Sequence, residues 1–182
     1  KYENLQVTNS FKDRGALNKL ASLGADERAR GVIAMSAGNH AQGVALSAQV
    51  LGCAATIVMP EWVSPSKQEA AAGYGATLLL AGKSLQESID RARELAASEI
   101  MTFIHPYDDE AVIAGQGTIG LEILEDLPET NMIVVPVGGG GLIAGVSLAV
   151  KAKRPQVRVI GVQAEACPSA PKVIVTPGRQ AA

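Results

Sequence analysis

Short apolar runs alternate with longer segments of helical periodicity along this chain of 182 residues. The apolar runs predict strands at residues 32–35, 55–59, 76–80, 102–104, 132–137 and 157–162. The segments between them predict helices near residues 11–23, 40–51, 65–72, 85–98, 110–127 and 142–153. Continuous apolar strands joined by helices of this length indicate an α/β fold with parallel sheets flanked by helices. Such sheets bind ligands outside the carboxyl ends of their strands, so chemistry is expected at the strand-to-helix turns.

Composition narrows the class of protein. Hydrophobic residues make up 47% and charged residues 19%, which is typical of a folded globular chain. A net charge of -2 gives no basic surface for nucleic acid or for an anionic membrane. No apolar run reaches the roughly 18 residues of a membrane span, and no apolar signal region follows Lys1, so the cytoplasm is the expected compartment. Cys53 and Cys167 lie far apart, which suggests neither a disulfide framework nor a zinc site.

Four consecutive glycines, Gly138, Gly139, Gly140 and Gly141, separate a predicted strand from a predicted helix. Glycine loses more backbone freedom on folding than any other residue, so ordering this run is unfavourable and indicates a structural or binding role for it. At such a turn, unpaired N–H groups and the positive end of the helix dipole converge and favour an anion. The pattern is not GxGxxG and no GK[ST] follows, so a compact phosphate fits better than a dinucleotide. A tight turn without a ligand is the alternative.

Lys12 opens a predicted helix directly after Thr8, Asn9 and Ser10, a cluster of good capping residues. A cation at a helix N-terminus opposes the helix dipole, so the pKa of Lys12 is expected to be lowered. A lysine with a lowered pKa is suited to Schiff-base chemistry. Taken alone, the same residue also fits a solvated surface position.

Polar groups follow the first predicted strand in the order Ser36, Gly38, Asn39 and His40. They offer a hydroxyl, an amide and bare backbone at a strand end, although Asn39 alone is also typical of a helix cap. His40 and His105 do not stand at metal-ligand spacing, so both are interpreted as hydrogen-bonded structural histidines. The acidic residues 108–110 are expected to begin a helix.

Taken together, these segments resemble the pyridoxal-phosphate enzymes of fold type II, in the threonine/serine dehydratase and serine racemase branch. The matching segments are KYENLQVTNSFKDRGA, SAGNHAQG, IHPYDDEAVIAGQGTIGLEI and PVGGGGLIAG, in the order and spacing of that family. The resemblance runs from Lys1 to about Glu165. It implies a two-lobed fold like that of tryptophan synthase β. Residues 25–105 would form the small lobe, and residues 1–24 and 106–182 would form part of the large cofactor-binding lobe.

The resemblance also implies how a cofactor would bind. Pyridoxal 5'-phosphate would be attached to Lys12, with Phe11 packed near the lysine and Asn39 hydrogen-bonded to the phenolic oxygen of the cofactor. The backbone of residues 138–141 and the N–H of Leu142 would hold the phosphate.

The implied substrate is a small amino acid. Its carboxylate would meet hydroxyl and N–H groups of Ser36, Gly38, Asn39 and His40. Lys12 would act as general base at the α-carbon, and the β-hydroxyl of L-threonine or L-serine would leave, giving a 2-oxoacid and ammonia. Ser36 could exchange a proton on the opposite face, so a serine racemase-like enzyme remains an alternative.

The sequence also departs from the family pattern. Nothing in residues 166–182 matches the segment that supplies a Ser, Thr or Cys to the pyridine nitrogen, so the large lobe is expected to be incomplete. Glu165 aligns with a ligand of a divalent-cation site, but Pro171 stands near the place of its acidic partner, which leaves a metal uncertain.

Two further interpretations stay open. The chain could be an inactive truncated fragment of the fold, at most weakly active alone, or a nucleotide-binding module, against which the missing fingerprint counts. An uncovered sheet edge would favour self-association, so a homo-oligomer, a dimer, is expected.

Overall fold

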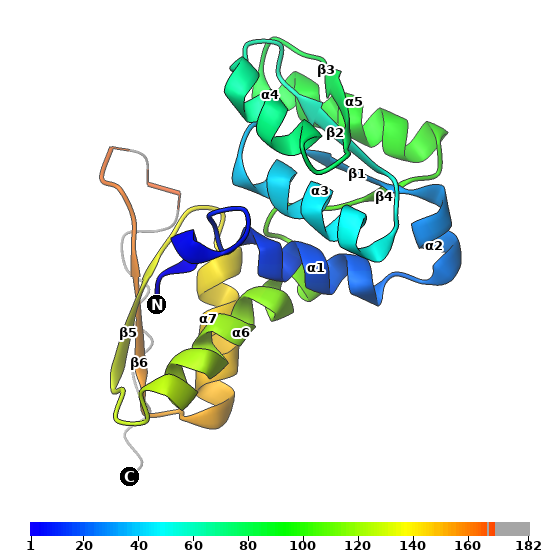
Figure 1. Cartoon of the computed structure of the whole chain (residues 1–182). Coiled ribbons are helices and arrows are strands. Elements are labelled where there is room, and N and C mark those ends of the chain that lie inside the picture. The colour runs from blue at the N-terminus through cyan, green and yellow to red at the C-terminus, as the bar shows by residue number, and fades with distance from the viewer. Residues whose placement is uncertain (167, 170–182) are drawn as a thin grey trace.

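Two parallel sheets and the helices packed on them make up the computed structural model of the chain, which describes residues 1–166, 168 and 169 (Figure 1). Cys167, Pro171 and the rest of segment 170–182 lie outside the described residues. In chain order the elements are η1 (Glu3–Leu5), α1 (Lys12–Ser22), α2 (Ala25–Arg30), β1 (Val32–Met35), α3 (Asn39–Leu51), β2 (Ala55–Met59), α4 (Pro65–Ala72), β3 (Thr77–Leu80), α5 (Leu85–Ser98), β4 (Thr102–Phe103), α6 (Glu110–Asp126), β5 (Met132–Pro136), α7 (Gly141–Lys153) and β6 (Arg158–Val162).

The first sheet has the strand order β3-β2-β1-β4, and every pairing in it is parallel. Its central strand β1 is buried on both faces, since Val32, Ile33 and Ala34 are each 0% exposed. Val32 and Ala34 pack into a core shared with α1 and α3, whereas Ile33 packs into a core with α5 on the other face. This two-sided burial explains why the strand is continuously apolar rather than alternating.

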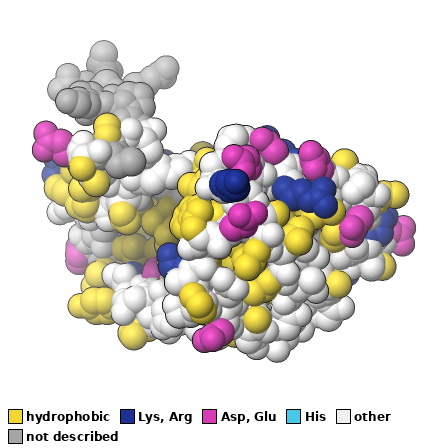
Figure 2. Space-filling model, turned by 90° about the horizontal axis from the view of Figure 1, so that it is seen from above, with side chains coloured by type: hydrophobic (Ala, Val, Ile, Leu, Met, Phe, Trp, Pro, Cys, Tyr) yellow, Lys and Arg dark blue, Asp and Glu magenta, His cyan; other side chains and the backbone are white. Residues whose placement is uncertain are grey.

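The second sheet pairs β5 with β6 in parallel, with Met132 opposite Arg158 and Pro136 opposite Val162. Ile133 and Val135 of β5 are buried in a core with α6 and α7, while Val134 between them is 59% exposed. The helices therefore cover one face of this sheet, and its other face is open within the described residues. Seen from above, exposed apolar side chains gather round a hollow beside the part that carries β5 and β6 (Figure 2).

Close helix packing joins the two sheets. α1 lies between α3 on one side and α6 on the other, and α6 packs along α7 (Figure 1). Glycines allow this approach, because a Cβ at Gly115 would lie 2.5 Å from the carbonyl oxygen of Arg14. A Cβ at Gly117 would lie 2.9 Å from the carbonyl oxygen of Gly145. The start of α1, where Lys12 lies, is thus fixed between both halves of the described chain.

The predicted α/β fold and all the predicted strands are confirmed, with small shifts at some strand ends. The sequence pattern missed η1 and the six-residue helix α2. The segment Ala25–Arg30 has no apolar stripe, and none of its residues is buried. The helix is instead capped at its start by the Glu27 carboxylate, which accepts a hydrogen bond of 2.8 Å from the N–H of Gly24.

Ion pairs tie the N-terminal segment to α1 and α6. Arg14 donates to Glu3 at 2.7 Å and to Glu122 at 2.5 Å, and its side chain is only 14% exposed. Lys1 also contacts Glu122, at 2.8 Å. The hydrogen bonds from Arg14, and then those from Lys1, lower the pKa of Glu122 to about 2.

Acid is expected to destabilise the fold through Glu122. Its carboxyl has an ordinary pKa of 4.5, lowered to about 2 in the folded chain, so its stabilising effect is present above pH 4.5 and is lost as the pH falls toward 2. Because this carboxylate is 37% exposed, Glu122→Gln should cost only about 1 kcal/mol at neutral pH. Urea unfolding at a series of pH values checks this, and the variant should show a shallower loss of stability in acid. A variant whose acid profile matches the parent would rule out the carboxylate as the cause.

Within the described part of the chain, no helix combines the length and the apolar character needed to cross a membrane.

Candidate functional site

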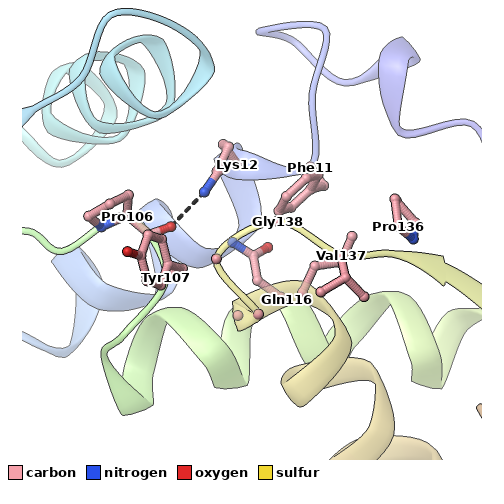
Figure 3. Close-up of a pocket in the computed structure, with 12 residues that line it drawn as sticks. Phe11, Lys12, Pro106, Tyr107, Gln116, Pro136, Val137 and Gly138 are labelled. Carbon is pink, nitrogen blue, oxygen red and sulfur yellow. Dashed lines mark hydrogen bonds between the residues drawn. The ribbon is translucent and has the colours of Figure 1, made fainter. Parts of the chain in front are cut away.

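A cavity of about 280 Å³ lies where the first turns of α1 and α7 meet the segment between β4 and α6 (Figure 3). Its lining residues are Phe11, Lys12, Pro106, Tyr107, Gln116, Pro136, Val137, Gly138, Gly139, Gly140, Gly141 and Leu142. The cavity lies at the carboxyl end of β5, which is the position expected for a ligand of a parallel sheet.

Lys12 extends into this cavity from the first residue of α1. Its Nζ donates a hydrogen bond of 2.6 Å to the carbonyl oxygen of Pro106 and lies 5.3 Å from the centre of the Phe11 ring. Burial lowers the pKa of Lys12, so the predicted direction is confirmed, and its cause is loss of solvent. The partial burial also excludes the alternative of a solvated surface lysine. A lowered pKa raises the fraction of neutral amine, which is the nucleophilic form.

The polar cluster before Lys12 shapes the start of α1. The Ser10 hydroxyl accepts a hydrogen bond of 3.2 Å from the N–H of Lys12. Thr8 does not cap the helix in this way, because its hydroxyl donates to the carboxylate of Asp13 and its N–H donates to the same group at 3.1 Å. The N-cap position itself is occupied by Phe11, which places the aromatic ring beside Lys12.

The four glycines of the turn serve different purposes. Gly140 has φ +89°, a left-handed conformation that other residues rarely adopt. A Cβ at Gly139 would overlap the ring of Tyr107, and one at Gly141 would lie 2.7 Å from its carbonyl oxygen. A Cβ at Gly138 would meet no atom of the described residues within 4 Å. Packing therefore explains Gly139 and Gly141, and backbone conformation explains Gly140. An added Cβ would meet open space at both Gly138 and Gly140, and of the four only Gly138 has neither reason within the described residues.

The same turn begins α7 without a side-chain cap. Gly140 is the N-cap residue, and no side chain of the described chain hydrogen-bonds the first turn at that point. The first N–H groups of a helix have no partner within the helix, so donors are left facing the cavity. This arrangement favours an anion.

The residues Ser36, Gly38, Asn39 and His40 do not line this cavity. Ser36 and Gly38 lie in the turn before α3, and Asn39 and His40 begin that helix. The helix packs against the first turn of α1, since a Cβ at Gly43 would lie 3.1 Å from the carbonyl carbon of Lys12. The Ser36 hydroxyl accepts a hydrogen bond of 3.1 Å from the N–H of Gly38. Asn39 is the first residue of α3, and Gly38 is the N-cap, so the interpretation of Asn39 as the cap is wrong.

Both histidines have structural hydrogen bonds, as predicted. His40 is buried, and its Nε2 lies 3.0 Å from the carbonyl oxygen of Ile104. Burial lowers the pKa of His40 to about 4, so the ring is neutral at neutral pH. His105 accepts a hydrogen bond of 2.8 Å from the N–H of Asp108. The acidic segment begins α6 as expected, because the Asp109 carboxylate accepts from the N–H of Ala111 at 2.9 Å.

Sequence reasoning missed Pro106, Tyr107 and Gln116 as parts of the cavity. They lie in the segment 104–123 that carried part of the resemblance, but nothing local marked them as neighbours of Lys12. Tyr107 covers one side of the glycine turn and packs edge-on against His105 with ring centres 4.7 Å apart.

Glu165 lies exposed after β6. Among the described residues no three His, Cys, Asp or Glu side chains gather in a way that could hold a metal ion. The divalent-cation site therefore stays a prediction.

Comparison with known proteins identifies the family. Residues 1–180 match the model of the family described as pyridoxal-phosphate dependent enzyme. A catabolic L-threonine dehydratase of Staphylococcus aureus is 56% identical over 165 residues, which are 91% of this chain and 48% of that protein. An L-threonine ammonia-lyase of Thermotoga maritima is 56% identical over 169 residues, or 93% of this chain and 42% of that protein.

Solved structures agree with this match. The processed form of threonine deaminase isoform 2 from Solanum lycopersicum has a TM-score of 0.88 at 46% identity and covers 90% of this chain and 48% of that chain. Maize serine racemase has a TM-score of 0.86 at 38% identity and covers 88% of this chain and 49% of that chain. The chain spans about half the length of the relatives that it matches. It belongs to the family of pyridoxal-phosphate dependent enzymes.

Proposed function

We propose that this chain carries the lysine and the phosphate site of a dehydratase that converts L-threonine or L-serine into a 2-oxoacid and ammonia. One observation carries the proposal: Lys12, with its lowered pKa, and the glycine turn 138–141 line the same cavity. The names of the relatives, L-threonine dehydratase and L-threonine ammonia-lyase, support the choice of reaction.

The lining residues fit the cofactor of the family. Pyridoxal phosphate needs an amine that is neutral often enough to attack its aldehyde, and burial favours the neutral form of Lys12. Its phosphate needs donors without competing side chains, and the uncapped start of α7 offers them beside the open space at Gly138. The ring of Phe11 provides an apolar wall next to Lys12.

When bound, pyridoxal phosphate supplies an electron sink for the carbanion at the α-carbon of the substrate. Lys12 holds the cofactor and, when its amine is free, removes the proton from that α-carbon. The turn 138–141 and the N–H of Leu142 bind the phosphate. Ser36, Gly38, Asn39 and His40, before and at the start of α3, would bind the substrate carboxylate, and Asn39 would also hydrogen-bond the phenolic oxygen of the cofactor.

We also propose a division into two lobes. The four-stranded sheet lies within residues 32–103, which agrees with a small lobe of residues 25–105. The helices α1, α6 and α7 and the pair β5–β6 then belong to the large lobe of residues 1–24 and 106–182. The face of β5–β6 that no described helix covers is an apolar surface that would favour a homodimer, which light scattering can test.

A serine racemase-like activity is the second candidate. The observation in its favour is the structural likeness to two serine racemases, from maize and from Dictyostelium discoideum, together with the position of Ser36 at the start of α3. A racemase needs a proton donor on the face of the α-carbon opposite to Lys12, and the Ser36 hydroxyl is a candidate for it.

The test is an assay of both products. The 182-residue chain, and a version extended at its C-terminus by the corresponding segment of a relative, are loaded with pyridoxal phosphate and given L-threonine or L-serine. We expect 2-oxoacid release, faster with the extended version. Formation of D-serine without 2-oxoacid would favour the racemase, and cofactor binding without either product would identify an inactive fragment.

Gly138 provides a test of phosphate binding. Gly138→Ala adds a Cβ that meets no atom within 4 Å in the part of the chain that the structure describes, so the stability of the fold should be unchanged. The same Cβ intrudes on the space proposed for the anion, and affinity for inorganic phosphate and for pyridoxal phosphate should fall by about tenfold. Calorimetric titration measures both affinities.

The matched control is Gly24→Ala, at a surface glycine whose added Cβ would meet only the Glu27 carboxylate, at 3.4 Å. Its affinities should equal those of the parent. Unchanged affinity in Gly138→Ala would show that the open space at this glycine has no part in binding an anion.

A further inference from the structure

Gln116 is a buried side chain whose hydrogen bonding is incomplete. It is 1% exposed, and within the described residues its Oε1 has no hydrogen-bond partner. A buried acceptor without a partner costs about 1–3 kcal/mol, so few persist without a reason. The side chain lines the cavity, and its amide end is directed from α6 toward Phe11 and Lys12 (Figure 3).

Gly15 makes room for this amide beside Lys12. A Cβ at Gly15 would overlap Nε2 of Gln116 and lie 2.8 Å from the carbonyl oxygen of Val112. Lys12 and Gly15 are three positions apart in α1 and therefore share one face of the helix. Side chains tilt toward the N-terminus of a helix, so the space left empty at Gly15 lies on the Lys12 side. In this structure Nε2 therefore lies on the Lys12 side; the two ends of an amide have the same shape, so a half turn of the amide exchanges them and brings Oε1 to that side, where it can receive a donor.

Lys12 is the cation of this cavity, and its ammonium group has more N–H donors than it has acceptors in contact with it. An ammonium group has three N–H donors, and the carbonyl oxygen of Pro106 accepts one of them. The titratable groups that face it are His40 from α3 and His105 and Tyr107 from the segment before α6. Burial lowers the pKa of both histidines, so neither brings a charge at neutral pH. Within the described residues no carboxylate forms an ion pair with Lys12.

We propose that Gln116 is a positioning residue for Lys12. Its Oε1 is a second acceptor for the Lys12 amine, to which that amine donates when it turns away from the carbonyl oxygen of Pro106, and the two acceptors together hold the free amine in the cavity. The flexible four-carbon stem of lysine allows the amine to turn from one acceptor to the other. The proposal rests on the proposed function, in which Lys12 is alternately attached to the cofactor and free to act as a base. A free base must be held in place to meet its proton, and Gln116 supplies the second point of support.

Two substitutions at Gln116 are expected to shift the titration midpoint of Lys12 in opposite directions. Gln116→Met keeps the length of the side chain but removes the acceptor, so the midpoint for titration of Lys12 should fall by about one pH unit. Gln116→Glu places a carboxylate beside the amine, and the midpoint should rise by about one pH unit or more. The midpoint is measured without cofactor, by trace acetylation with acetic anhydride from about pH 6 to pH 11. Mass spectrometry of the peptide that contains Lys12 gives the extent of reaction, and the exposed Lys67 in the same digest is the reference.

Opposite shifts in the two variants support the proposal, because a packing role alone would not change sign. No shift, or a shift of both midpoints in one direction, would overturn it. Loss of the helical circular dichroism in both variants would also overturn it, by making Gln116 a packing residue. Failure of pyridoxal phosphate to label Lys12 in the parent would instead refute the proposed function and leave the titration result standing.

Discussion

Lys12→Ala is expected to abolish covalent attachment of pyridoxal phosphate and to lower 2-oxoacid formation by at least about 10³-fold. In the proposed function Lys12 provides both the attachment point and the base at the α-carbon, and a positioned base alone contributes about 10²–10⁴-fold. The partly buried amine donates to Pro106 and has no carboxylate partner in the described chain, so its removal should leave the fold intact. Reduction with borohydride followed by peptide mapping shows where the cofactor is attached.

Two control variants separate the effects in this experiment. Lys67→Ala removes an exposed lysine of α4 and should leave both labelling and activity unchanged. Lys12→Arg keeps a positive charge in the cavity but cannot attach the cofactor, so it should lose the label as completely as Lys12→Ala. A label that persists on other lysines in Lys12→Ala, with activity retained, would show that a different residue holds the cofactor.

Gly145→Val is expected to destabilise the chain by about 4 kcal/mol or more, at the upper end for a single substitution. A Cβ at this position would overlap the carbonyl oxygen of Ile113 and lie 2.7 Å from the backbone nitrogen of Gly117. Both obstacles are backbone atoms of α6, which cannot rotate away as a side chain can. A domain is stable by only about 5–15 kcal/mol, so the variant should be largely unfolded or insoluble.

The control for Gly145→Val is Ala152→Val, at an exposed position of the same helix. It should cost only the difference in helix propensity, about 0.5 kcal/mol. Urea unfolding followed by circular dichroism compares the two variants. Similar unfolding midpoints would mean that α6 and α7 have room between them at Gly145.

The sheet could be predicted from the sequence because its pattern is local. The run at 32–35 follows Gly31, the run at 55–59 precedes Pro60, and both are almost wholly apolar. They form β1 and β2 with the predicted ends. The helix α2 could not be predicted in this way, because it buries none of its residues and so has no apolar stripe. Its start depends on the contact between the Glu27 carboxylate and the N–H of Gly24, which produces no periodic apolar pattern in the sequence.

The residues of the candidate site also fall into two groups, those that could be predicted from the sequence and those that could not. Lys12 and the glycine turn were predicted, because a lysine at a helix start and glycines at a strand end are visible in a short window. Tyr107 and Gln116 were not, because their relation to Lys12 exists only after α1 and α6 have packed together. Gly15 and Gly115 are the residues of the sequence that could have indicated this packing. Glycine inside a helix is unfavourable by about 1 kcal/mol, so its presence indicates that another helix approaches closely. That approach also buries Lys12, which is the cause of its lowered pKa.

The contact between Lys12 and Pro106 joins residues 94 positions apart. Closing a loop of that size loses chain entropy before any contact in the cavity is gained, so such contacts form slowly and late in folding. During synthesis on a ribosome the chain emerges from its N-terminus, and Lys12 is made long before the glycine turn 138–141 that lines the other side of its cavity. A nascent chain that ends before this turn therefore holds its lysine without a pocket. Cofactor capture by Lys12 would then mark the moment at which the second half of the cavity has been translated and folded.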